Sequence, residues 1–247
     1  MPRKQRFFLP HVPLHIVQCG HAKHAIFFDD EDREVYLDCC ATAAARYGAK
    51  VYSYVLMRNC VHLLLVPESV ESATRVMQHI GRLYVPYINA KYDTSGTLWE
   101  GRFKSSLVDD QTYFLACMRY IEMAPVRAGL CDSPQKYHWS SYVWNSQDTH
   151  ESHRHQLLHR HPIYKALGDD SETRRTRYRE FFHGEIPENE LVDISAAWQT
   201  GTPLGSRRFK NQVEAMLGQK VGQARRGRPS GYSPRKSDLV NACGVGA

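Results

Sequence analysis

The sequence predicts an α+β fold in which a four-stranded antiparallel sheet carries helices. Three observations predict it. The chain has 247 residues, 42% of them apolar, which is enough to bury a core. Short runs that alternate with period two indicate strands, and longer runs with apolar residues at i, i+3, i+4 and i+7 indicate helices. These runs follow one another as strand, helix, strand, strand, helix, strand and helix. That is the order of the ferredoxin-like split βαβ arrangement, with one extra helix.

Each element follows from its periodicity and from the residues that flank it. The predicted strands are residues 11–19, 49–57, 61–67 and 104–108, and the predicted helices are residues 30–47, 69–90 and 110–123. Asp29 or Asp30 is a suitable N-cap for the first helix, and Gly48 is a suitable C-cap. Arg58-Asn59-Cys60 is expected to form the turn between the second and third strands.

Serines and prolines set the expected limits of the later helices. Ser69 or Ser72 is expected to cap the second helix, and Pro86 is expected to kink it or end it early. Residues 93–101 are expected to form a loop, and Pro125 to end the third helix. The first two helices are expected to cover one face of the sheet. The other face is then left for a ligand or for the third helix.

The composition changes after the first domain, residues 1–145. Residues 146–162 contain five histidines whose spacings match no standard zinc site, so this stretch is expected to be a linker. Residues 163–218 are expected to be helical, and helices at residues 188–199 and 206–217 would form a helix-turn-helix outline around residues 200–205. Residues 219–247 are expected to be a basic, disordered tail.

Positive charge is concentrated near the C-terminus. The formal net charge is +6, and residues 206–236 hold nine basic residues against one acidic residue, Glu214. A basic block of this density indicates a polyanionic partner, most simply nucleic acid. The alternative is a solvated tail without a partner.

Other classes of protein are disfavoured by composition. No apolar run approaches the ~20 residues that cross a bilayer, and no apolar region follows the basic N-terminus as in a secretion signal. A cytoplasmic protein without a membrane partner is therefore expected. The seven cysteines are odd in number and include no CxxC pair, so reduced thiols are expected rather than a disulfide framework.

Two groups of residues carry candidate chemistry. Cys60 and His62 lie two positions apart in a strand, so they share one face and form half of a metal site. The alternative is a buried thiol beside a hydrogen-bonded core histidine. Tyr120 lies in the third helix near Arg119 and Arg127, which are suited to hold phosphates. The alternative is a structural tyrosine.

Cations and an aromatic residue indicate contacts with DNA. The loop 96–104 combines them as single-strand binding sites do, although Trp99 buried in the core is the alternative. Arg225-Arg226-Gly227-Arg228-Pro229 is similar to an AT-hook, which enters the minor groove, and a plain basic tail is the alternative. The candidate DNA-binding residues are Trp99, Arg102, Lys104, Arg119, Arg127, Arg207, Arg208, Lys210, Arg225, Arg226 and Arg228.

Several segments, in this order, carry a resemblance to a known family. They are MPRKQRFFLP at the start, YVLMRNCVHLLLVP at 54–67, GTLWEGRFKSSLV at 96–108, YFLACMRYIEMAPVRAGL at 113–130, WSSY at 139–142 and TGTPLGSRRF at 200–209. The chain resembles the REP-associated tyrosine transposases and related single-tyrosine HUH insertion-sequence transposases. The resemblance runs from about Pro2 to Trp144, and more loosely to about Pro229.

The resemblance implies DNA strand breakage and rejoining. It makes Tyr120 the nucleophile that forms a 5′-phosphotyrosine on single-stranded hairpin DNA and leaves a free 3′-OH. It makes His62 the second histidine of a pair that binds a divalent cation, magnesium or manganese. Single-stranded or hairpin DNA is the implied partner of a monomer or homodimer.

Two expected metal ligands are replaced. The family's Asn-His-Val-His reads Asn59-Cys60-Val61-His62, and the Asn of its Tyr-Ile-x-x-Asn-Pro is Ala124. A cysteine ligand is soft and favours zinc over magnesium. Glu122 lies about 200° around the helix from Tyr120 and is a poor substitute.

Three hypotheses therefore remain open at the level of the sequence. The first is an active transposase with an altered metal site. The second is a catalytically impaired protein that still binds hairpin or single-stranded DNA. The third is an RNA-binding ferredoxin-like module, which the absence of an aromatic RNP pattern disfavours.

Overall fold

A four-stranded antiparallel sheet forms the centre of the molecule. The computed structural model describes residues 6–147 and 156–221. The strands are β1 (Leu14–Cys19), β2 (Ala49–Met57), β3 (Cys60–Pro67) and β4 (Lys104–Leu107), in the order β2-β3-β1-β4. The predicted α+β fold, with two consecutive strands hydrogen-bonded as a hairpin, is confirmed.

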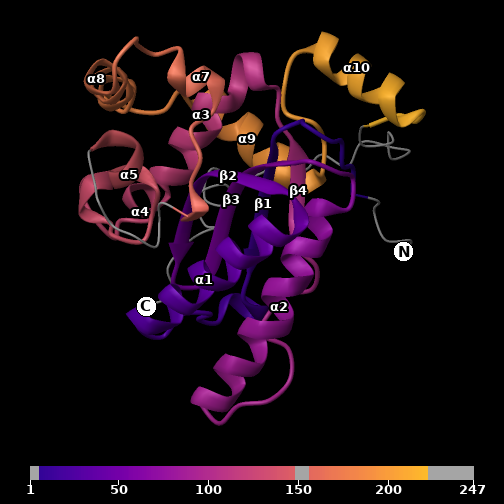
Figure 1. Cartoon of the computed structure of the whole chain (residues 1–247), viewed down its shortest axis with the longest axis vertical. Helices are drawn as coiled ribbons and strands as arrows, with labels where there is room; N and C mark the ends of the chain where they lie inside the picture. Colours follow the sequence, from indigo (N-terminus) through magenta and orange to yellow (C-terminus); the bar gives the residue numbers. More distant parts are fainter. Residues whose placement is uncertain (1–5, 148–155, 222–247) are drawn as a thin grey trace, which may run out of the picture.

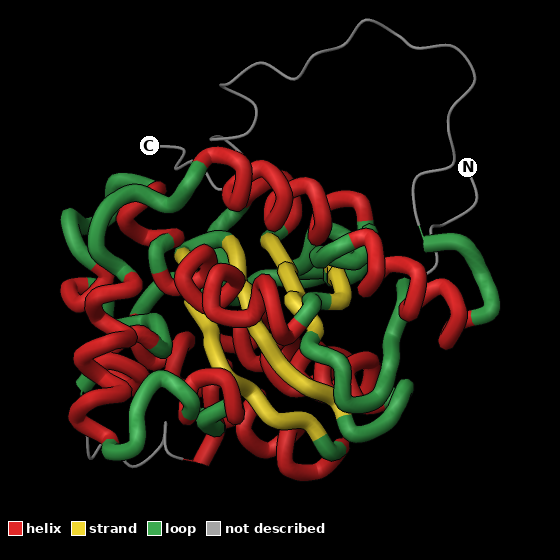
Figure 2. The backbone as a smooth tube through the Cα atoms, turned by 90° about the horizontal axis from the view of Figure 1, so that it is seen from above, coloured by secondary structure: helices red, strands yellow, loops and turns green. Residues whose placement is uncertain are grey.

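Helices cover both faces of the sheet (Figures 1 and 2). In the part of the chain that the structure describes, the α-helices are α1 (Asp30–Tyr47), α2 (Ser72–Lys91), α3 (Asp110–Glu122), α4 (Ala124–Arg127), α5 (Tyr142–Ser146), α7 (Pro162–Lys165), α8 (Ser171–Phe181), α9 (Glu188–Thr200) and α10 (Arg207–Leu217). Short 3-10 turns, η1 (His21–Lys23) and η2 (Pro134–Lys136), lie between them. Within these described ranges no helix is both long and apolar enough to span a bilayer.

The first two helices pack on one face, as expected. Alternate residues of the inner strands, such as Ile16 and Leu63, join them in one apolar core. The Asp29 side chain accepts a hydrogen bond from the Asp32 amide and so caps α1 in a capping box, and Gly48 ends the helix with a positive φ of 65°.

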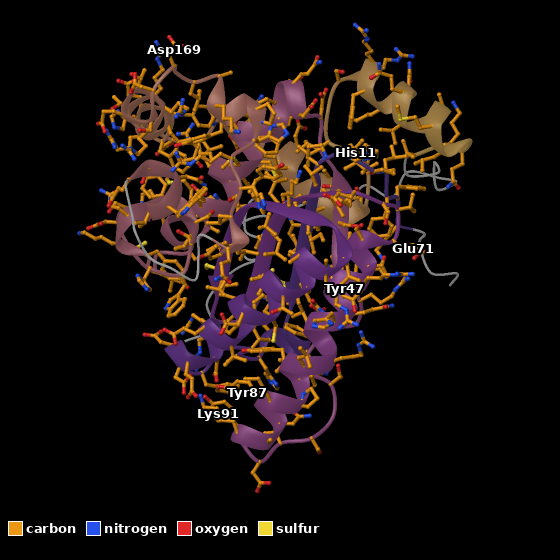
Figure 3. The ribbon with its side chains drawn as sticks, viewed as in Figure 1. His11, Tyr47, Glu71, Tyr87, Lys91 and Asp169 are labelled. Carbon is orange, nitrogen blue, oxygen red and sulfur yellow. A yellow bond between two sulfur atoms is a disulfide. The ribbon has the colours of Figure 1, made fainter. Side chains whose placement is uncertain are left out.

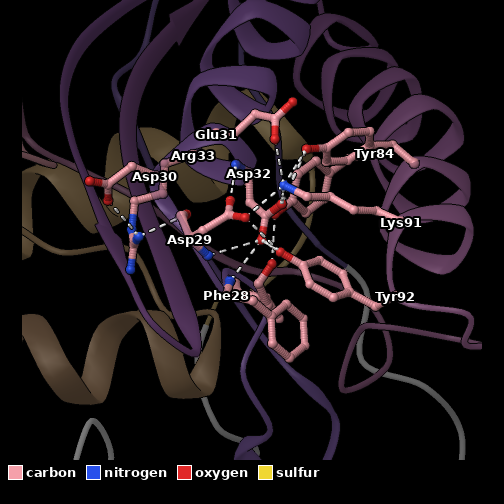
Figure 4. Close-up of polar contacts among 11 residues, drawn as sticks. Phe28, Asp29, Asp30, Glu31, Asp32, Arg33, Tyr84, Lys91 and Tyr92 are labelled. Carbon is pink, nitrogen blue, oxygen red and sulfur yellow. Dashed lines mark hydrogen bonds and ion pairs between the residues drawn. The ribbon is translucent and has the colours of Figure 1, made fainter.

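A polar cluster ties the start of α1 to the end of α2 (Figure 4). Lys91 Nζ donates to carboxylate oxygens of Asp29, Glu31 and Asp32 at 2.8–3.0 Å. It also donates to the hydroxyl of Tyr87, which lies beside it at the lower end of α2 (Figure 3). Since every group has a partner, this cluster fixes the two helices to each other.

The two prolines differ in effect: Pro86 does not end its helix, whereas α3 ends at Glu122, one residue before the predicted end ahead of Pro125. Helix α2 continues through Pro86 to Lys91, so the predicted early end is wrong. Pro125 follows α3, but it occupies the first turn of α4, where its missing N–H costs no helical hydrogen bond. The chain therefore stays helical for one more turn and carries Arg127 back toward the sheet.

The second face of the sheet is covered by α3 and by α9 from the C-terminal region. Phe114 and Ile121 of α3, with Ile194 and Trp198 of α9, form a second core against Val17 and its neighbours on this face. Trp198 lies in the predicted helix-turn-helix outline, yet its side chain is buried. The segment after α9 also joins the sheet, because Leu204 N–H donates to the carbonyl oxygen of Leu107 at the end of β4.

The expected linker is partly built into this fold. Of its histidines, those at 150, 153 and 155 lie outside the described residues. Leu158 pairs with Val51 of β2 in a parallel bridge. His161 stacks on Phe114 with ring centroids 4.0 Å apart and accepts a hydrogen bond from the Ile163 amide at the start of α7. The bridge and the two contacts of His161 attach this stretch to β2, α3 and α7.

Candidate functional site

Four chemically active side chains gather on the face that α3 and α9 cover. The antiparallel register pairs Val17 of β1 with His62 of β3, and Cys19 with Cys60. Side chains of paired residues share a face, and alternate residues along a strand do so as well. His15, Cys19, Cys60 and His62 therefore form one row across the two central strands.

Two buried histidines are hydrogen-bonded within this row. His15 Nε2 lies 3.0 Å from His62 Nδ1, and both side chains are fully buried. Burial lowers the pKa of His15 to about 3, and the positive charge of Arg127 acts in the same direction. Burial, followed by His15 and Arg127, also holds the pKa of His62 well below its usual value. Both imidazoles are thus neutral at physiological pH.

Helix α3 places Tyr120 against the same two histidines. The Tyr120 ring centroid is 5.9 Å from that of His15 and 6.1 Å from that of His62. The guanidinium of Arg127, held on α4, lies 4.2 Å from the centre of the Tyr120 ring. The nucleophile and the histidine expected from the sequence are therefore neighbours, although 58 positions separate them in the chain.

Helix α9 covers this group. Trp198 Nε1 donates a 3.3 Å hydrogen bond to the Tyr120 hydroxyl. The Trp198 ring also contacts His62 edge-on, with centroids 6.0 Å apart. Only 6% of Tyr120 is exposed. Trp198 therefore covers part of the Tyr120 side chain, including its hydroxyl.

An open groove leads to the site along β4 and α9. A cavity of about 410 Å³ is lined by residues that include Arg6, Arg102, Lys104 and Trp198. A second cavity of about 390 Å³ shares Lys104 and Trp198 with the first and extends over Lys23 and the Cys19–Cys60 pair. Burial, followed by the like charge of Arg102, lowers the pKa of Arg6. We call this shared space the basic groove.

Residues 9–124 match the sequence profile of a family described as Transposase IS200 like. These residues, a little under half of the chain, therefore form a domain of the IS200-like transposase type. A solved structure of the REP-associated tyrosine transposase bound to a REP hairpin has a TM-score of 0.51 with 10% identity, over 59% of this chain and 85% of that one. This likeness concerns the fold.

A structure described as that of a transposase candidate from Deinococcus radiodurans R1 has 21% identity and a TM-score of 0.35, over 49% of this chain and 96% of that one. No curated protein matches the sequence at a significant level.

The structure corrects the expectation of reduced thiols in this transposase domain. Cys19 and Cys60 are joined by a disulfide between β1 and β3. The remaining thiols of the described residues, Cys39, Cys40, Cys117 and Cys131, are free. In the disulfide form the Cys60 sulfur is not a thiolate, so the predicted role of Cys60 as a metal ligand does not fit this state.

The donors present do not fit the magnesium or manganese ion that the family implies. Ala124 has no donor atom and is buried. Glu122 faces away from Tyr120 and is hydrogen-bonded to Ser53, Ser141 and other groups. Among the residues that the structure describes, no group of three or more His, Cys, Asp or Glu side chains is arranged to hold a metal. Only His62 remains from the predicted pair.

Two of the residues predicted to contact DNA are buried. Trp99 belongs to the core beneath α2, where its ring stacks on Tyr84 with centroids 6.1 Å apart. Arg119 is buried, and its Nη2 donates to the carbonyl oxygens of His183 and Gly184 at 3.1 and 2.8 Å. In this structure both side chains therefore make contacts within the fold.

The other predicted cations are distributed over the surface. Arg102 and Lys104 are exposed in the basic groove, and Arg127 lies at Tyr120. Arg207 and Arg208 are exposed at the start of α10, and Lys210 lines a neighbouring cavity. Arg225, Arg226 and Arg228 lie outside the described residues.

Sequence reasoning missed His15, Cys19 and Trp198. The signal for the first two was present, because both lie in an alternating strand and share the parity that places side chains on one face. The register that brings this strand beside His62 is set by the whole sheet. Trp198 gave no local signal, since its contacts depend on how α9 folds back over the domain.

Proposed function

We propose that this protein binds single-stranded or hairpin DNA in the basic groove and breaks and rejoins one strand through Tyr120. The observation that carries the proposal is the contact of Tyr120 with His15, His62 and Arg127 on one covered face. The match of residues 9–124 to the IS200-like transposase family supports the reaction class.

The chemistry follows from these side chains. The Tyr120 oxygen attacks the scissile phosphorus, the bond between phosphorus and the 3′-oxygen breaks, and a 5′-phosphotyrosine and a 3′-OH result. The phenol proton passes by way of a neutral imidazole of the His15–His62 pair to the departing 3′-oxygen, which leaves as the 3′-OH, and burial keeps both imidazoles neutral before and after the step. Arg127 supplies positive charge beside the reacting phosphate. Rejoining reverses these steps.

The basic groove supplies the binding energy. Its lining includes one acidic residue, Glu100, and four basic residues: Arg6, Lys23, Arg102 and Lys104. Arg6 and Arg102 repel each other, which a bound phosphate relieves. Lys104 lies over the Trp198 ring, 5.4 Å from its centre, so cationic and aromatic surfaces adjoin as in single-strand binding sites.

The decisive experiment is covalent capture of DNA. A labelled hairpin from the flank of the protein's own gene is mixed with the full chain in buffers that contain magnesium, manganese or zinc in turn. Denaturing gels should show a covalent band for the wild type and none for Tyr120→Phe. Tyr113→Phe, on the same helix, is the matched control and should retain the band.

A second function, DNA binding without cleavage, is favoured by one observation. Cys60 is held in a disulfide and Ala124 carries no donor, so two positions expected to hold a metal do not. If native gels show a shifted complex but no metal yields a covalent band, the protein is a hairpin-binding relative that has lost strand cleavage.

A further inference from the structure

The disulfide lies where a reductant has access to it. Cys60 is 2% exposed, whereas Cys19 is half-buried. Both line the cavity of about 390 Å³ that forms one end of the basic groove. A small thiol reagent that enters this cavity therefore reaches the two residues that the disulfide joins.

A nitrogen donor already faces the sulfurs. His62 Nε2 lies 4.0 Å from Cys60 Sγ. Two ligands of one tetrahedral zinc ion, a thiolate at about 2.3 Å and an imidazole nitrogen at about 2.05 Å, are about 3.5 Å apart. The present separation is thus close to that of a shared metal. Cys19 is the register partner of Cys60, so its sulfur lies on the same side.

The second histidine fixes the orientation of the first. If His62 Nε2 binds a metal, its Nδ1 carries the proton and donates to His15 Nε2, 3.0 Å away. Metal-bound histidines usually have such a partner on the other ring nitrogen. His15 Nδ1 has no hydrogen-bond partner among the described residues, so it is able to carry the second proton of this pair.

We propose that reduction of the Cys19–Cys60 disulfide creates a zinc site whose protein ligands are Cys19 Sγ, Cys60 Sγ and His62 Nε2. The fourth position opens into the cavity, and His15 is the positioning residue. Two thiolates and an imidazole select zinc over magnesium, because soft ligands disfavour the hard cation. Cys60, which stands where the family has a histidine, thus forms a pair of thiolate ligands with Cys19.

The reduction is balanced by a dithiol. The reagent transfers two electrons and two protons to the sulfur–sulfur bond and leaves as its own disulfide. Cys19 and Cys60 become thiols. Zinc binding then displaces both thiol protons into solvent. Oxidation by a disulfide reagent reverses the exchange and releases the metal, so the site is controlled by the thiol redox state.

The test uses cobalt as a spectroscopic substitute for zinc, with the full chain and no DNA. The protein reduced by a dithiol should bind one equivalent of Co²⁺ with a thiolate-to-cobalt charge-transfer band, and one equivalent of Zn²⁺ should remove this band. The oxidised protein should show no band. Cys19→Ser and Cys60→Ser should each weaken the band, and Cys131→Ser, which alters a free thiol elsewhere, should leave it unchanged.

A second measurement covers variants that fold poorly. Zinc should protect two thiols of the reduced wild type from a thiol reagent, and His15→Ala should lower zinc affinity about 10- to 100-fold while the thiolate band persists. Metal binding without the band, or a band unaffected by Cys19→Ser, would place the metal on other histidines and overturn the proposal. Neither outcome depends on DNA cleavage, so failure here leaves the function proposed for Tyr120 standing.

Discussion

At the scale of single residues, Glu122 shows how a side chain next to the site is used for folding. Its Oε1 accepts hydrogen bonds from Ser53, Ser141 and Asn145, and its Oε2 accepts one from Tyr178 of α8. The sequence showed that this carboxyl points away from the tyrosine. It did not show that the carboxyl joins β2, α5 and α8, because those partners lie far away in the chain.

This carboxyl should make stability depend on pH. Burial raises the pKa of Glu122 from 4.5 to about 7, although its hydrogen bonds act in the opposite direction. Between these pH values the folded state holds a proton that the unfolded state has lost, so the free energy of unfolding falls as pH rises. The loss should total about 3 kcal/mol, at 1.36 kcal/mol per pKa unit.

The measurement is urea unfolding at pH 5 and pH 8. Glu122→Gln removes the titrating group, so this variant should lose about 2.5 kcal/mol less than the wild type between the two pH values, because the unfolded carboxyl is already largely ionised at pH 5. Glu180→Gln, an exposed change on α8, should behave as the wild type does. Equal pH dependence in Glu122→Gln and the wild type would show that this carboxyl is not the source.

At the scale of elements, α9 was predicted well in its limits and poorly in its role. Residues 188–199 were expected to be helical, and α9 spans Glu188–Thr200. A helix-turn-helix outline suggested a helix presented to DNA. Local periodicity identifies an apolar stripe but not the surface that the stripe will cover. In the structure this stripe packs on α3 and the sheet, and Trp198 reaches Tyr120.

The hydrogen bond from Trp198 of α9 to the Tyr120 hydroxyl should slow the strand cleavage that we propose. Trp198→Phe keeps an aromatic ring but removes the N–H that donates to the Tyr120 oxygen. A hydrogen bond of about 1 kcal/mol corresponds to a factor of about five. Covalent capture of a hairpin should therefore start about fivefold faster, measured as the initial rate of adduct formation at saturating DNA.

Gln199→Ala is the matched control for this change. Gln199 lines the same groove and neighbours Trp198 in α9. It has a hydrogen bond to Ser195 within the helix. Its replacement should leave the initial rate unchanged. If Trp198→Phe also leaves the rate unchanged, movement of α9 does not limit access to the tyrosine.

At the scale of the whole molecule, the sequence predicted the sheet and its first two helices because each strand and cap carries a local signal. The site itself depends on register. Cys19 meets Cys60 only because β1 pairs with β3 in one particular register, and no short window of the sequence encodes that pairing. The sequence indicated that loop 96–104 is basic and aromatic, but it did not show which of its side chains face outward. Trp99 packs into the core, whereas Arg102 and Lys104, nearby in the chain, line the groove.

This placement leads to a prediction about salt. If Arg102 and Lys104 contact phosphates, Arg102→Ala with Lys104→Ala should weaken single-strand binding. It should also make the plot of the logarithm of the binding constant against the logarithm of salt concentration shallower by about 1.4, since each single-strand phosphate contact contributes about 0.7.

Arg75→Ala with Arg82→Ala removes the same charge from α2 on the opposite side of the sheet. This control lowers long-range attraction equally but removes no groove contact, so its slope should stay near that of the wild type. Equal slopes for the two double variants would mean that net charge, rather than the groove, binds the DNA.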